Sequence, residues 1–95
     1  MAKFRSYCIV IHNVVSNCKQ TVLQHVSGAK RSAVAVEPYS EQDGFHVHIQ
    51  IEYPNQRHFN SVLKEFEAFA KVIVAPRPDG EERSWGRVQV DQMRS

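Results

Sequence analysis

The clearest pattern in the chain is an alternation of apolar and polar side chains over nine residues. It runs from Phe45 to Tyr53, where every second residue is apolar and the residues between are polar. A period of two is that of a β-strand with one buried and one solvated face. His46 and His48 therefore lie on the same, polar face of the predicted strand.

Two segments have the spacing of amphipathic helices. Apolar residues recur every three or four positions from Phe59 to Ala70, with lysines and glutamates between them. A shorter helix is predicted earlier in the chain, with Ser16 or Asn17 as its N-cap and its end near Gly28. Each helix has one apolar face with which it can cover a sheet.

The remaining strands are short segments rich in β-branched and aromatic residues. We predict strands at Phe4–His12, Ala33–Glu37, Val72–Ala75 and Trp85–Val90, and a charged turn over residues 76–82. The first has consecutive apolar residues, as a central strand buried on both faces requires. The second, stopped by Pro38, should form a hairpin with Phe45–Tyr53 through a turn at Asp43-Gly44, and that strand should break at Pro54.

The predicted order along the chain is β-α-β-β-α-β-β. It indicates an α+β fold, with a five-stranded antiparallel sheet, both helices on one face and the histidine face open to a ligand. Residues 1–95 suit one small domain. No apolar run is long enough for a membrane helix, and residues 1–5 do not resemble a secretory signal, so we expect a soluble intracellular protein.

The distribution of charge is more informative than its sum. A net charge of +2 is too small to indicate a nucleic-acid partner. Arginines nevertheless gather in the last quarter of the chain, at positions 77, 83, 87 and 94, beside Trp85. Arg77, Arg83 and Arg87 could bind phosphates, and Trp85 could either stack on a base or pack in the core. A solvated loop that carries arginines is the alternative.

His46 and His48 are spaced to share one metal ion. Their α-carbons should lie about 6.6 Å apart on one strand face, which lets both imidazoles reach one ion. Glu37, at the end of the neighbouring strand, could add a carboxylate across the hairpin, and Gln50 is near enough to ligate weakly or to hold a water. Glu52 lies too far along the strand. Two histidines and a carboxylate, joined by phosphate oxygens, favour Mg²⁺ or Mn²⁺.

The run His46-Val47-His48 resembles the motif of the HUH endonucleases, which has two histidines around one hydrophobic residue. The nearest likeness is to the replication initiators of eukaryotic circular single-stranded DNA viruses, such as circoviruses and geminiviruses. Asn13 lies where the first motif of that family occurs, Glu37 where an acidic metal ligand does, and Asn60 in the helix after the histidines.

The resemblance implies a ferredoxin-like or RRM-like HUH endonuclease fold and a metal site of Glu37, His46 and His48. The implied activity is a metal-dependent nicking and joining of single-stranded DNA at a viral replication origin, through a 5′-phosphotyrosyl intermediate. Asn13 joins the predicted DNA-binding residues. The resemblance also implies a helicase domain downstream and a location in the host nucleus.

The nucleophile of this family is a tyrosine on a helix after the last strand, followed by a lysine. The chain ends at Ser95, where that helix should begin, so we predict that it is truncated and that the tyrosine lies beyond Ser95. Tyr7 and Tyr53 are expected to be buried. Tyr39, just past Glu37, is the alternative nucleophile within the chain.

Three other functions fit parts of the pattern. A non-catalytic single-stranded nucleic-acid-binding module of RRM-like fold has the same layout, but carries stacking aromatics where this chain has His46, His48 and Gln50. A metal-dependent small-molecule enzyme is compatible with the same ligand types. The run from His46 to Glu52 also imitates half of a cupin motif, but two helices in so short a chain argue against an all-β barrel.

Overall fold

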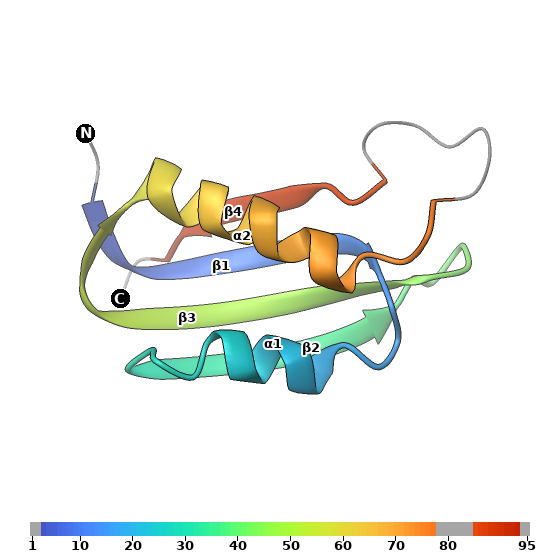
Figure 1. The fold of residues 1–95 in the computed structure, drawn as a ribbon, viewed down its shortest axis with the longest axis horizontal. Coiled ribbons are helices and arrows are strands. Elements are labelled where there is room, and N and C mark those ends of the chain that lie inside the picture. Colours follow the sequence, from blue (N-terminus) through green and yellow to red (C-terminus); the bar gives the residue numbers. More distant parts are fainter. Residues whose placement is uncertain (1–2, 78–84, 94–95) are drawn as a thin grey trace.

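The computed structural model describes residues 3–77 and 85–93, which form four β-strands and two α-helices (Figure 1). In chain order these are β1 (Lys3–Val14), α1 (Lys19–His25), β2 (Arg31–Pro38), β3 (Phe45–His58), α2 (Phe59–Ile73) and β4 (Val88–Gln92). The α+β class predicted from the sequence is confirmed. Neither helix within the described ranges is long and apolar enough to cross a membrane.

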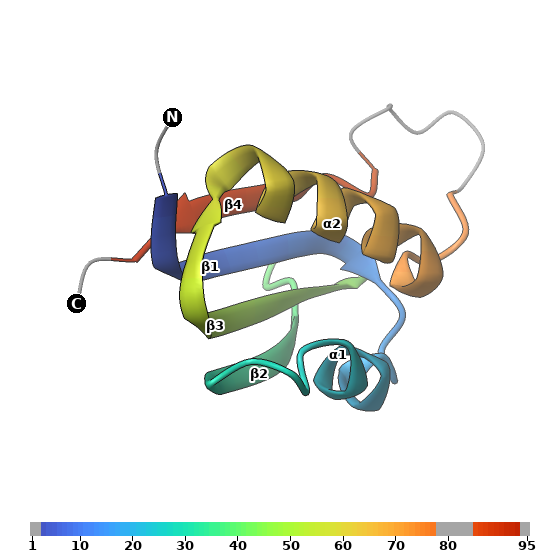
Figure 2. The same ribbon diagram turned by 60° about the vertical axis from the view of Figure 1, so that its left-hand side comes forward.

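The four strands make one antiparallel sheet in the order β2-β3-β1-β4. Both helices cover the same face of it, as the two views of the ribbon show (Figures 1 and 2). Val22 of α1 and Phe66 of α2 belong to one core cluster with the inward residues of the strands. The opposite face, which we call the open face, carries no helix in the described part of the chain.

The core forms where the strand and helix patterns meet. The alternation of β3 is confirmed, because Val47, Ile49, Ile51 and Tyr53 are all buried. The apolar stripe of α2 packs against them and buries Val62, Phe66, Phe69, Ala70 and Ile73. The open face consequently receives the polar residues of β3.

Strand β1 is central, as predicted, and lies between β3 and β4. The expectation that both of its faces are buried is wrong. Tyr7, Ile9 and Ile11 are fully buried under the helices, whereas Val10 and His12 are only half-buried on the open face. The reason is that both helices lie on one side of the sheet, so nothing in the described structure covers the other side.

In residues 3–77 and 85–93 the sheet has four strands, not the predicted five. Val72 and Ile73 are the last residues of α2, and Val74 makes only an isolated bridge to Val14. Ile73 is 1 % exposed because it continues the buried stripe of α2. Burial on the helical stripe therefore prevails over the β propensity of three consecutive β-branched residues.

Strand β3 passes through Pro54 and ends at His58, so the predicted break is also wrong. Between the pairs Phe4–Arg57 and Ser6–Glu52, β1 has one residue and β3 has four. The extra residues of β3 form an irregularity in the ladder. Pro54 lies within it, where no regular ladder hydrogen bond is required from its backbone nitrogen.

The boundaries of the other elements differ by a few residues from those predicted. The N-cap of α1 is Cys18, not Ser16 or Asn17, and α1 ends before Gly28. The β2–β3 hairpin is confirmed: the Tyr39 amide donates to the Gly44 carbonyl at 3.1 Å. Gly44 adopts a φ of 112°, which a residue with a side chain rarely does. Strand β4 begins at Val88, so Trp85 precedes it.

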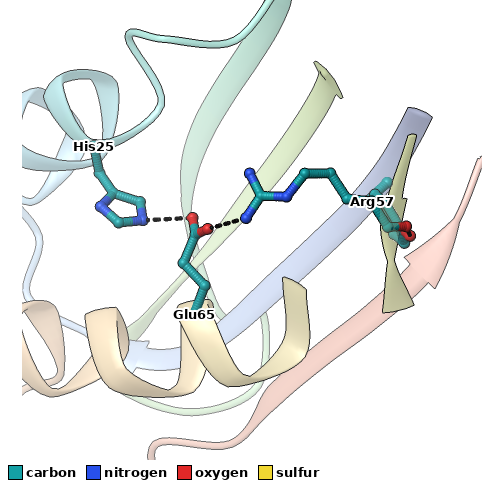
Figure 3. A network of polar contacts seen from close by, with 4 residues as sticks. His25, Arg57 and Glu65 are labelled. Atoms are coloured by element: carbon teal, nitrogen blue, oxygen red, sulfur yellow. Dashed lines mark hydrogen bonds and ion pairs between the residues drawn. The ribbon is translucent and has the colours of Figure 1, made fainter. Parts of the chain in front are cut away.

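A small polar network lies on the helical side of the sheet (Figure 3). Glu65 of α2 contacts the His25 imidazole at 3.1 Å and the Arg57 guanidinium at 2.9 Å. The His25 ring also stacks on Phe69, with 4.0 Å between the ring centroids. The network connects α1, α2 and the end of β3, although such partly exposed ion pairs contribute only about 0–1 kcal/mol each.

Two buried tyrosines beside this network differ in one hydrogen bond and make a matched pair. The Tyr7 hydroxyl donates to the Arg57 carbonyl, whereas the Tyr53 hydroxyl has no partner among the described residues. We expect Tyr7→Phe to lower the free energy of unfolding by about 1 kcal/mol. Tyr53→Phe should leave stability unchanged or increase it, because it removes a buried polar atom without breaking a bond. Urea unfolding at pH 7 measures both.

Tyr53→Phe should also change the response of the protein to alkaline pH. Burial raises the pKa of Tyr53 to about 12 from its ordinary value of 10.0. The stability associated with the neutral hydroxyl is therefore complete below pH 10 and is lost as the pH rises toward 12. Tyr53→Phe should lose less free energy of unfolding over that interval than the wild type. An identical loss in both proteins would contradict this assignment.

Candidate metal centre

Glu37, His46 and His48 meet on the open face near one end of the sheet. Strands β2 and β3 pair antiparallel with Glu37 opposite His46 and Ala35 opposite His48. Because residues two apart point to the same side of a strand, the two imidazoles and the carboxylate share that face. The structure therefore brings together the three residues that the sequence predicted, and they could hold a metal ion.

The spacing of their ligand atoms suits one small ion. One donor atom from each side chain lies within 4.8 Å of the others. His48 Nε2 is 3.5 Å from Glu37 Oε1, and the centroids of the two imidazole rings are 4.7 Å apart. Two atoms that bind one ion at about 2.1 Å each are at most about 4.2 Å apart. Side-chain shifts of less than about one ångström would therefore bring all three donor atoms within reach of one ion.

His46 is half-buried, whereas Glu37 is exposed. Burial, and then the neighbouring His48, lower the pKa of its imidazole below the ordinary value. The ring is therefore uncharged at neutral pH, which is the form that binds metals. His46 Nδ1 is buried and has no hydrogen-bond partner among the described residues. An ion bound between the three side chains is one way to satisfy a nitrogen of this ring, so the donor set fits a metal.

The other side chains of β3 on this face extend away from the cluster. Gln50 follows His48 on the same face and is exposed, so it remains a neighbouring residue that could ligate weakly or hold a water. Glu52 lies one step further and contacts the Arg31 guanidinium at 3.6 Å. Its exclusion from the predicted ligand set agrees with this position.

Two residues beside the cluster were not identified as a unit from the sequence. His12 of β1 pairs with His46 in register, and its ring contacts Tyr39. The Tyr39 hydroxyl is 2.8 Å from His12 Nδ1, and its ring centroid is 4.7 Å from that of His46. The sequence analysis predicted no functional role for His12. One signal in the sequence could have identified His12: Ile9 and Ile11 point to one face of β1, so His12 points to the other. This signal becomes informative only when that other face is known to be open.

Only some of the predicted DNA-binding residues lie near the metal cluster in the described structure. Asn13 and Arg87 lie beside His12 and line a hollow next to the metal cluster. Arg77 is exposed after the end of α2, and Arg83 lies outside the described residues. The Trp85 indole is half-buried and donates from Nε1 to the Ala75 carbonyl at 2.8 Å. Its predicted stacking on a base remains a prediction.

No protein-family model matches the chain, and no curated protein or solved structure matches it significantly. We therefore infer the function from the geometry of this site and from the sequence motif.

Proposed function

We propose that the chain is the DNA nicking and joining domain of a rolling-circle replication initiator of the HUH type. The observation that carries this proposal is the cluster of Glu37, His46 and His48 on an open sheet face. Two histidines separated by one hydrophobic residue, with a carboxylate from the paired strand, are the arrangement that the sequence motif implies. The sheet order β2-β3-β1-β4 with both helices on one face supports a ferredoxin-like fold of this type.

In this proposal Glu37, His46 and His48 hold a divalent ion, Mn²⁺ or Mg²⁺, at the scissile phosphate. When bound, the ion supplies positive charge that stabilises the negative phosphate oxygens. The protein contributes an uncharged His46 and an exposed carboxylate on Glu37, and it leaves one side of the cluster open to solvent. A single strand can approach this side because no helix within the described residues covers it.

The proposed chemistry also requires a tyrosine. Its hydroxyl gives up its proton as the oxygen attacks the phosphorus, the bond from phosphorus to the 3′-oxygen breaks, and that oxygen takes up a proton and leaves as a 3′-hydroxyl. The 5′-phosphate stays on the tyrosine. Tyr7 and Tyr53 are buried beneath the helices and cannot reach a strand on the open face. We place the attacking tyrosine beyond Ser95, and Tyr39 is the alternative.

Binding of single-stranded DNA with and without metal tests the function. A fluorescent 20-nucleotide pool of random sequence should bind the full chain more tightly than its duplex does, and more tightly in Mn²⁺ than in EDTA. The dependence on Mn²⁺ should disappear in His46→Ala/His48→Ala. Anisotropy measures both effects. Absence of single-strand binding would overturn the proposal and favour a metal-dependent enzyme that acts on a small molecule.

A denaturing gel of the same mixtures tests the origin of the nucleophile. We expect no protein–DNA adduct from this chain in Mn²⁺. An adduct that disappears in Tyr39→Phe would make Tyr39 the nucleophile and would contradict its placement beyond Ser95.

The strand order favours one second candidate, a non-catalytic single-strand-binding module of RRM-like fold. The two functions differ in their dependence on metal. Single-strand binding that is equal in Mn²⁺ and EDTA, and equal in the double-histidine variant, would support the binding module.

A further inference from the structure

His12 and Tyr39 together form a flat aromatic surface on the open face. Their ring planes differ by only 4°, and the ring centroids are 6.1 Å apart. Tyr39 Oη and His12 Nδ1 are 2.8 Å apart. Rings in face-to-face contact are further apart, because their carbon atoms are separated by about 3.5–4.0 Å. The two rings therefore meet through their edges and not face to face, and their planes are parallel. We call this surface the His12–Tyr39 platform.

Hydrogen bonds hold both rings of the platform in place. The backbone N–H of Asn13 donates to the Tyr39 hydroxyl oxygen at 3.1 Å, and His12 Nε2 is 2.9 Å from Gln89 Oε1. One assignment of hydrogens satisfies every group: Tyr39 donates to His12 Nδ1, and His12 Nε2–H donates to Gln89. Three segments of the chain thus fix the platform before any ligand binds, so little ordering cost remains for binding.

A hollow lies against the platform. It has a volume of about 460 Å³ and is lined by His12, Tyr39, Asn13, Arg87 and residues 40–42. This volume is in the range of sites for small organic molecules. The lining residues therefore include two aromatic rings, two residues with side-chain amides, an arginine and Glu41.

We propose that this hollow binds one unpaired nucleobase of single-stranded DNA, stacked on the His12–Tyr39 platform. This inference rests on the proposed function and names a substrate contact of the same site. A flat rigid platform suits a base, since every base has a π-face that can stack on an aromatic ring. The Glu41 carboxylate would repel a phosphate in the hollow but can accept a hydrogen bond from the amino group of a base.

The position of the platform relates this base to the metal cluster. Tyr39 contacts His46 directly, so the bound base belongs to a nucleotide beside the phosphate at Glu37, His46 and His48. Arg87 lines the hollow from the side of β4 and can contact a phosphate of the same strand. The platform would thus fix the position of the strand along the sheet relative to the cluster.

Two labelled probes of equal length separate base stacking from binding of the backbone. One is a 10-nucleotide single strand of mixed sequence, and the other is the same sugar-phosphate strand without bases. Anisotropy is measured with the full chain in EDTA, so that metal binding cannot contribute. Tyr39→Ala removes the ring and Tyr39→Phe retains it, while Thr21→Ala on the exposed side of α1 is the control.

We expect Tyr39→Ala to bind the base-bearing strand about tenfold more weakly than the wild type does, which is the usual effect of one lost stacking contact. Its affinity for the strand without bases should not change. Tyr39→Phe should lose less than Tyr39→Ala, and Thr21→Ala should match the wild type. The unfolding midpoint of each variant confirms that it is folded.

Two results would overturn the platform while the proposed function stands. In one, wild type and Tyr39→Ala bind the base-bearing strand equally. In the other, Tyr39→Ala weakens both strands by the same factor, which indicates an effect on the backbone contacts or on the fold. Binding of single-stranded DNA by the wild type in Mn²⁺ but not in EDTA would also overturn the platform alone. If the wild type binds no single-stranded DNA in either EDTA or Mn²⁺, the proposed function and this inference fail together.

Discussion

Saturating Mn²⁺ should raise the unfolding midpoint of this chain by on the order of 10 °C, and His46→Ala/His48→Ala should abolish that rise. A ligand at about 100 times its Kd stabilises the folded state by about 2.7 kcal/mol when it does not bind the unfolded chain. A domain of this size gains about 4–8 °C per kcal/mol. The double variant removes both nitrogen ligands of the cluster. Scanning calorimetry or thermal circular dichroism measures the midpoints.

Two single variants show whether the effect belongs to the cluster. Glu37→Gln removes the charge of the third ligand and should reduce the rise. Glu52→Gln changes a carboxylate on the same strand face that contacts Arg31 and not the cluster, so it should keep the full rise. A rise that persists in His46→Ala/His48→Ala would place the ion elsewhere. No rise in the wild type would refute the metal centre.

Phe66→Ala should lower the free energy of unfolding by about 3–5 kcal/mol. Phe66 is fully buried at the centre of α2, where its ring contacts those of His25 and Phe69 edge-on. Truncation removes apolar contacts and leaves a cavity between the helices and the sheet. The total free energy of unfolding of such a domain is only about 5–15 kcal/mol. This single substitution therefore removes a large part of the stability. Urea unfolding followed by circular dichroism gives the difference.

A milder variant keeps this prediction testable if Phe66→Ala does not fold. Phe66→Leu retains most of the apolar volume and should cost less than Phe66→Ala. Lys64→Ala, on the exposed side of the same helix, should change stability by no more than about 0.5 kcal/mol. If Phe66→Leu and Lys64→Ala were equally mild, α2 would not be the helix that closes the core.

The sequence determined the parts of the fold that local periodicity encodes. The alternation in β3 and the stripe of α2 each bury apolar residues at one fixed period, so their buried faces were predicted correctly. The meeting of Glu37 with the two histidines was also predictable. These residues lie on adjacent strands of one hairpin, where a short connection and the parity of the strands fix which side chains share a face.

Only the tertiary structure decided the features that depend on distant segments. Val72 and Ile73 have the β propensity of a strand, but the core contacts of α2 keep them helical, so the sheet has four strands. Likewise, the contact of His12 with Tyr39 joins residues 27 positions apart. It requires β1 to lie beside β3 with His12 opposite His46, and no local pattern specifies that register. Local periods fix which face of an element is apolar, whereas the pairing of distant strands fixes which polar residues meet.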